Sequence, residues 1–60
     1  MHATEVQDVA RRLYEAHGAK AIAEAAQKAV AGEQAGNEGE AATWRRIEAA
    51  IRLMAGPRAK

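Results

Sequence analysis

This chain of 60 residues contains no cysteine and no serine. Without cysteine, neither a disulfide nor a thiolate metal site can stabilise the fold, and cysteine usage leaves the redox compartment undetermined. Charged residues interrupt every apolar stretch well before about 20 residues, the length that a membrane-spanning helix needs. Charges near the start, from Glu5 to Arg12, also argue against a secretory signal. We therefore expect a cytoplasmic protein without a transmembrane segment.

Large apolar side chains are scarce as well. The chain has 17 alanines, but only 12 of its residues are apolar and larger than alanine. Fully burying one such side chain contributes roughly 1.5–3 kcal/mol, and a domain of this size only just balances the entropy of ordering its chain. We expect one small domain over 1–60, and a self-associated or partner-bound state would relieve the shortage of core.

The first predicted helix covers 4–17. Thr4 and Gln7 have the spacing of a capping box, in which each side chain bonds a free backbone N–H at the start of a helix. Gly18 stands where a residue in the left-handed conformation commonly ends a helix. Between these signals, apolar residues and one histidine recur every three or four positions on one face: Val6, Val9, Ala10, Leu13, Tyr14 and His17.

The second predicted helix covers 19–34 and is rich in alanine. Because its buried face consists mostly of methyl groups, a neighbouring helix can approach it closely. We expect on that face Ile22, Ala26, Ala29 and Val30, and on the opposite face a ladder of charges four residues apart, Lys20, Glu24 and Lys28. The first connection is short, and an alternative is that Gly18 only kinks one long helix.

The third predicted helix covers 37–55. Asn37 and Glu40 form a second capping box at its start, and Gly56-Pro57 ends it. Its most apolar stripe consists of Trp44, Ile47, Ile51 and Met54. The fold class is therefore all-α, a compact three-helix arrangement in which the third helix packs across the first two. Trp44 is expected to be the largest buried side chain, with flexible tails at 1–3 and 56–60.

Leu53 does not belong to this stripe and is predicted to lie on the outer face of the third helix. A single exposed leucine is ordinary on a protein surface. The alternative is a small contact surface for a second copy or for another protein, made of Ala42, Ala49 and Leu53 with Arg46 beside them.

Residues for catalysis are nearly absent. Thr4 is assigned to a cap, and Thr43 has no histidine or lysine one helical turn away that could activate its hydroxyl. His2 and His17 are too far apart in sequence for a local metal motif. His17 is expected to bond the free carbonyls at the end of the first helix, and a role as a ligand or proton switch is the alternative. We therefore predict no enzymatic activity, no cofactor and no metal.

Charge is divided unevenly along the chain. Residues 1–40 hold four basic and seven acidic groups, whereas residues 41–60 hold five basic groups and one acidic group. Nucleic-acid binding is thus a second hypothesis, and its contact residues would be Arg45, Arg46, Arg52, Arg58 and Lys60. The acidic first turn of the third helix, with Glu38 and Glu40, would repel phosphate and argues against it.

Two signatures carry a resemblance to known proteins: His17-Gly18, and the stretch from Gly36 through Asn37 and Gly39 to Trp44-Arg45-Arg46-Ile47. Over about 5–55 the chain resembles a family of very small bacterial all-helical proteins of unknown function. The resemblance implies a compact helical domain without assigned catalytic residues. Because large core residues are scarce and Leu53 is expected on the outer face of the third helix, our leading hypothesis is a non-enzymatic, self-associating module for protein–protein interaction.

Overall fold

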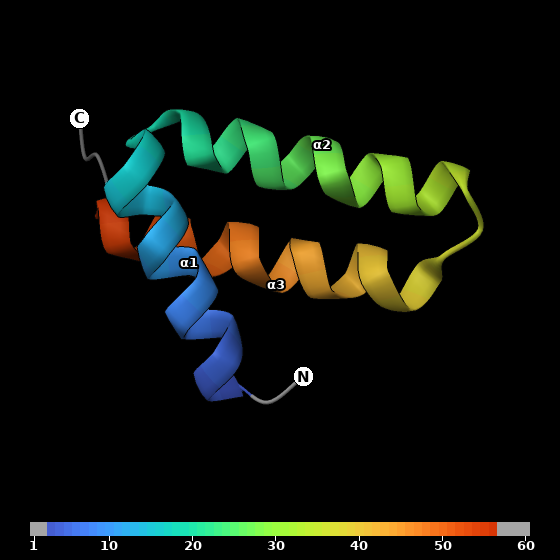
Figure 1. Cartoon of the computed structure of the whole chain (residues 1–60), viewed down its shortest axis with the longest axis horizontal. Coiled ribbons are helices and arrows are strands. Elements are labelled where there is room, and N and C mark those ends of the chain that lie inside the picture. Colours follow the sequence, from blue (N-terminus) through green and yellow to red (C-terminus); the bar gives the residue numbers. More distant parts are fainter. Residues whose placement is uncertain (1–2, 57–60) are drawn as a thin grey trace.

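The computed structural model describes residues 3–56, and for residues 3 and 4 only the backbone. It contains three α-helices, α1 (Ala3–His17), α2 (Lys20–Gln34) and α3 (Glu38–Ala55), coloured from blue to red in Figure 1. The predicted all-α arrangement is confirmed. Ala3, expected in a tail, belongs to α1, and the expected capping side chain of Thr4 and most of the C-terminal tail lie outside the described residues.

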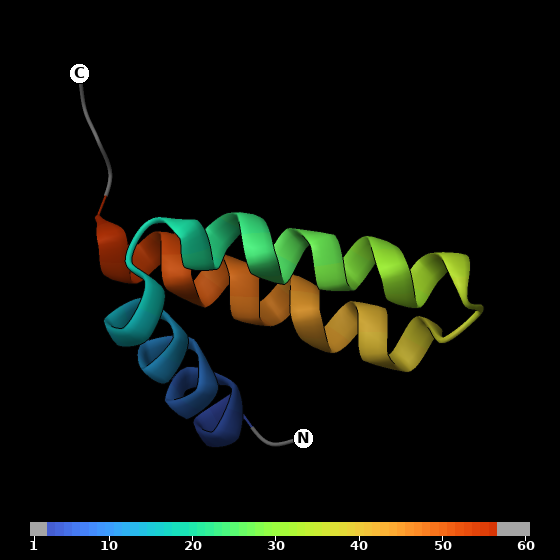
Figure 2. The same ribbon diagram turned by 45° about the horizontal axis from the view of Figure 1, so that its top comes forward.

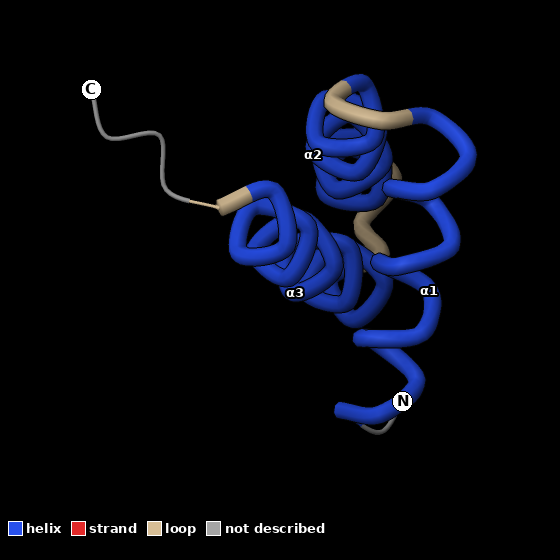
Figure 3. Tube along the Cα trace, turned by 90° about the vertical axis from the view of Figure 1, so that its left-hand side faces the viewer, coloured by secondary structure: helices blue, strands red, loops and turns tan. Residues whose placement is uncertain are grey.

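Helices α2 and α3 run antiparallel and side by side as a hairpin, and α1 crosses one end of it (Figures 1 and 2). Seen along the hairpin, α1 lies beside both other helices (Figure 3). Most of the interhelical contact joins α2 to α3, and α3 also packs against α1. The prediction that α3 packs across the other two is therefore confirmed, but the far half of the hairpin has no third helix over it (Figure 1).

The connection between α1 and α2 is a true break. Gly18 has a φ of 64°, in the left-handed region that favours glycine. Its N–H donates to the carbonyl oxygen of Tyr14 at 2.7 Å, which closes the last turn of α1, and its own carbonyl accepts from Ala21 at 3.0 Å. The chain then leaves in a new direction (Figure 2). A single kinked helix, the alternative for this segment, is wrong.

The turn between α2 and α3 satisfies both helix ends. The N–H groups of Gly36 and Asn37 donate to the carbonyls of Glu33 and Gly32 at 3.1 and 2.7 Å, a Schellman motif. The side-chain oxygen of Asn37 accepts from the backbone N–H of Glu40 at 3.2 Å, as predicted. Because the backbone N–H of Asn37 is already used, the Glu40 carboxylate instead accepts from the Asn37 side-chain amide, at 2.9 Å.

Replacing Asn37 with alanine is expected to lower the free energy of unfolding by about 1 kcal/mol, because the N–H of Glu40 loses its acceptor. Asn37→Ser is the matched control, since a serine hydroxyl is a comparable N-cap acceptor and should restore most of the loss. Urea unfolding followed by circular dichroism measures both. Equal destabilisation by the two variants would show that the cap is not what Asn37 contributes.

The buried face of α2 differs from the prediction. Val30 is 41% exposed, and Ile22 and Ala26 are only partly buried. The buried residues are all small: Ala21, Ala25, Ala29 and Gly32. This stripe lets the backbones of α2 and α3 approach so closely that a Cβ built on Gly32 would lie 3.1 Å from the backbone nitrogen of Ala41. Val30, two positions before Gly32, lies on nearly the opposite side of α2 from this stripe.

The core lies where all three helices meet. Its largest fully buried side chains are Ile47 and Ile51 of α3, surrounded by smaller residues of all three helices, Val6, Ala10, Ala21, Ala25 and Ala50. Trp44, predicted to be the largest buried side chain, is only partly buried at the margin of this cluster. The Nζ atom of Lys28 lies 5.4 Å from the centre of its ring. Because α1 does not reach over the whole hairpin, the indole stays partly open to solvent.

Candidate interaction surface

The four residues predicted to contact a protein share one exposed face of α3. They are spaced by four, three and four residues, and we call them the outer stripe: Ala42, Arg46, Ala49 and Leu53. All four are exposed, and Leu53 is 79% exposed. The predicted outward position of Leu53 is confirmed. The stripe lies on the opposite side of α3 from Ile47 and Ile51, because helical periodicity separates the two sets.

Helix α1 lies beside this stripe and forms one side of a groove with it. A shallow groove between α1 and α3 is lined by Val6 and Gln7 of α1 and by Arg46, Ala49, Ala50 and Leu53 of α3. Ala42 lies one turn before Arg46 and does not line the groove. Sequence reasoning missed the contribution of α1, because periodicity assigns Val6 to a buried face without saying which residues of another helix it meets.

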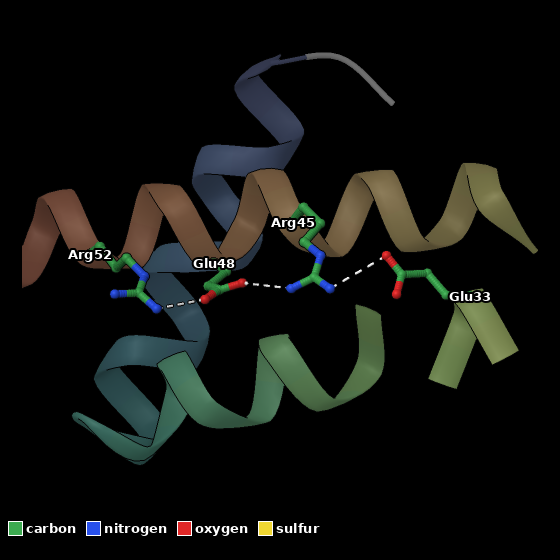
Figure 4. A network of polar contacts seen from close by, with 4 residues as sticks. All are labelled: Glu33, Arg45, Glu48 and Arg52. Atoms are coloured by element: carbon green, nitrogen blue, oxygen red, sulfur yellow. Dashed lines mark hydrogen bonds and ion pairs between the residues drawn. The ribbon is translucent and has the colours of Figure 1, made fainter. Parts of the chain in front are cut away.

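Two of the arginines predicted to contact nucleic acid are paired with carboxylates. Arg45 lies 3.3 Å from Glu33 of α2 and 3.6 Å from Glu48, and Arg52 lies 2.7 Å from the same Glu48. Figure 4 shows these four side chains as one chain of alternating charge. The Glu48 side chain is only 13% exposed, so solvent screens it less than the arginines. Arg45 and Arg52, seven residues apart, share one flank of α3.

This pairing weakens the nucleic-acid hypothesis. A phosphate approaching Arg45 or Arg52 would have to compete with carboxylates already in contact, and it would be repelled by them. Arg46 is on the outer stripe, away from this flank, and Arg58 and Lys60 lie outside the described residues. Contact of these five residues with nucleic acid stays a prediction.

His17 does not occupy the place expected for it. Its side chain is 45% exposed, and its Nδ1 lies 3.4 Å from a carboxylate oxygen of Glu24. Among the hydrogen bonds of residues 3–56, none joins its ring to a carbonyl at the end of α1. The predicted ladder on α2 is also not formed, because Glu24 is paired with His17 while Lys28 covers Trp44.

Thr43 and the acidic and histidine side chains are the remaining candidates for chemistry. The Thr43 hydroxyl donates to the carbonyl of Gly39 at 3.1 Å, an ordinary bond within a helix. Within the described part of the chain, no three acidic or histidine side chains are placed to hold a metal ion together. None of the three helices has the length and apolar character needed to cross a membrane.

Comparison of the chain with family models, with curated proteins and with solved structures finds no significant match in any of the three. The resemblance to small bacterial helical proteins therefore stays a prediction, and the outer stripe is interpreted from its own residues.

Proposed function

We propose that this protein is a non-enzymatic helical module for protein–protein interaction, and that it associates with a second copy of itself through the outer stripe. The single observation that carries the proposal is Leu53, which is 79% exposed at the end of a regularly spaced stripe. Leu53 is the most exposed large apolar residue of the described chain, and it stands beside a groove rather than on an open convex surface.

The chemistry of the stripe suits a protein partner. Three of its four residues are apolar, and its one charged residue, Arg46, has a long aliphatic stem that can cover apolar surface while the guanidinium stays in water. Small residues such as Ala42 and Ala49 allow another helix to approach closely. Such a face gives a partner helix apolar area to bury while the charged end of Arg46 stays in water.

The size of the core supports self-association in particular. Among the described side chains, only Ile47 and Ile51 are large and fully buried, so the isolated chain gains little from its interior. Binding between folded copies adds stability by mass action. A second copy needs no other gene product to be present, which makes it the first partner to test.

Sedimentation over a range of micromolar concentrations tests this proposal with two matched variants. Leu53→Asp should turn a reversible dimer into a monomer, because association would then bury an unpaired carboxylate. Val30→Asp is the control, since Val30 is also large, apolar and exposed, at 41%, but lies on α2. It introduces the same charge away from the stripe and should leave the dimer intact.

Two results would contradict the proposal. One is a wild-type chain that stays monomeric throughout the concentration range and melts at high temperature, since it then has no shortage of core to relieve. The other is a dimer that Val30→Asp dissociates and Leu53→Asp does not, which would move the contact to α2. Circular dichroism of both variants confirms that each remains helical.

A further inference from the structure

We infer that this protein has a second mode of self-association, in which two copies exchange α1. Each α1 then packs on the hairpin of the other copy, in the place that it occupies on its own hairpin in the closed chain. This mode is separate from the outer stripe and does not use it. Three observations lead to it: a helix break at a single residue, backbone carbonyls without a donor beside that break, and buried faces that line up across it.

The break between α1 and α2 depends on one residue. Gly18, with a φ of 64°, is the only residue of the range 3–34 that has a positive φ. Ala19 already has helical dihedral angles, a φ of −63° and a ψ of −23°. The N–H of Gly18 also donates to the carbonyl four residues before it, as in an α-helix. A rotation of the backbone at Gly18 alone would therefore join α1 and α2 into one continuous helix.

The closed chain leaves helical hydrogen bonds unmade at this break. No backbone N–H of the described residues donates to the carbonyls of residues 15–17. The N–H groups of Ala21 and Ile22 donate to carbonyls only three residues back. In a continuous helix, each of these carbonyls accepts from the N–H four residues further on. Opening the chain thus forms new backbone bonds, but it removes the core face of α1 from its own hairpin.

The hairpin of a second copy is the surface that fits this face of α1. Val6 and Ala10 of α1 pack in the core with Ile47 and Ile51 of α3, and α1 contacts α3 more than α2. In an open chain these four residues would be exposed to solvent. A second copy, opened in the same way, offers the same surface. Exchange therefore restores the contacts of α1, which is why swapping an identical element is a low-cost route to dimers.

The buried faces of α1 and α2 also line up in the continuous helix. Ala10 of α1 and Ala21 of α2 are both fully buried and stand eleven residues apart, about three full turns. They therefore lie on the same side of the long helix. Two such helices that cross near Gly18 place α1 of each copy beside α2 and α3 of the other.

Gly18→Ala tests the exchange, in full chains that also carry Leu53→Asp so that the outer stripe does not contribute. No atom lies within 4 Å of a Cβ built on Gly18, so alanine disfavours the closed form through its φ and not through a clash. Alanine also favours a continuous helix. Sedimentation should give a dissociation constant of the dimer at least about 100-fold lower than for the same chain with Gly18.

Gly36→Ala, in the same Leu53→Asp chain, is the matched control. It adds the same strain, at a φ of 79°, and a Cβ there also meets no atom within 4 Å. Asn37 beside it is non-helical too, with a φ of −101° and a ψ of 77°, so relaxing one residue does not open this turn. The variant should lower the free energy of unfolding and leave the chain monomeric.

Spin labels on Glu5→Cys and Gln34→Cys then measure whether the Gly18→Ala chain is open, because the natural sequence has no other cysteine. Double electron–electron resonance is recorded on labelled chains diluted with unlabelled ones, so that both labels belong to one chain. In a continuous helix the two labelled positions are roughly 44 Å apart, at about 1.5 Å per residue. In the closed chain they are closer together, because the chain turns at Gly18 (Figure 2).

A Gly18→Ala dimer that shows the long distance supports the exchange. A dimer with the shorter distance of the closed chain overturns it. A Gly18→Ala chain that stays monomeric, or that loses its helices instead of forming a dimer, also overturns it. The proposed function is judged separately, from whether Leu53→Asp alone dissociates the wild-type dimer.

Discussion

Replacing Ile51 with alanine is expected to lower the free energy of unfolding by about 3 kcal/mol, within the usual range of about 2–5 kcal/mol for a buried isoleucine. Ile51 is 0% exposed and packs in the cluster where all three helices meet. The truncation leaves a cavity that small neighbours such as Ala10 and Ala25 cannot fill. In a domain of this size, the melting temperature should fall by roughly 12–24 °C.

Leu53→Ala is the matched control for this experiment, because it removes an apolar side chain of similar size from the same helix, two residues further on. Since Leu53 is 79% exposed, its truncation should change the free energy of unfolding by less than about 0.5 kcal/mol. Urea unfolding at a protein concentration where only monomer is present keeps self-association out of the comparison. Similar losses in both variants would contradict the position of Ile51 in the core.

Replacing Gly32 with leucine should destabilise the fold by about 2–3 kcal/mol, the upper range for overpacking a contact. A Cβ at this position would lie 3.1 Å from the nitrogen and 3.3 Å from the Cα of Ala41. These are backbone atoms of the facing helix, which cannot rotate away as a side chain could. Helices α2 and α3 would therefore have to move apart along the stripe of small residues that joins them.

Gly39→Leu is the control, since no atom lies within 4 Å of a Cβ built there and leucine is the better helix former. That variant should be as stable as the wild type or slightly more stable. Thermal unfolding gives the difference, and the fluorescence of Trp44 reports whether its contact with Lys28 across the hairpin changes. A Gly32→Leu protein with wild-type stability would show that α2 and α3 are not held at the described distance.

Local signals in the sequence were sufficient for the helices and their ends. Gly18 and the pair of Asn37 and Glu40 act through bonds that reach only three or four residues along the chain, so their positions predict a break and a cap directly. Periodicity likewise placed Leu53 outside and Ile51 inside, because one helical turn fixes which residues share a face.

The sequence by itself thus determined the three helices, their boundaries to within one residue at the ends compared, and the outer stripe of α3. Only the tertiary structure decided which face of α2 is buried, the stripe of alanines and Gly32 and not Val30, and that Trp44 lies at the margin of the core. It also decided that Glu24 pairs with His17 and that Val6 lines the groove between α1 and α3. These features depend on how closely and at what angle the helices pack. The distance and the crossing angle between two helices depend on all the side chains of their interface together. They therefore cannot be predicted from the sequence of one helix alone.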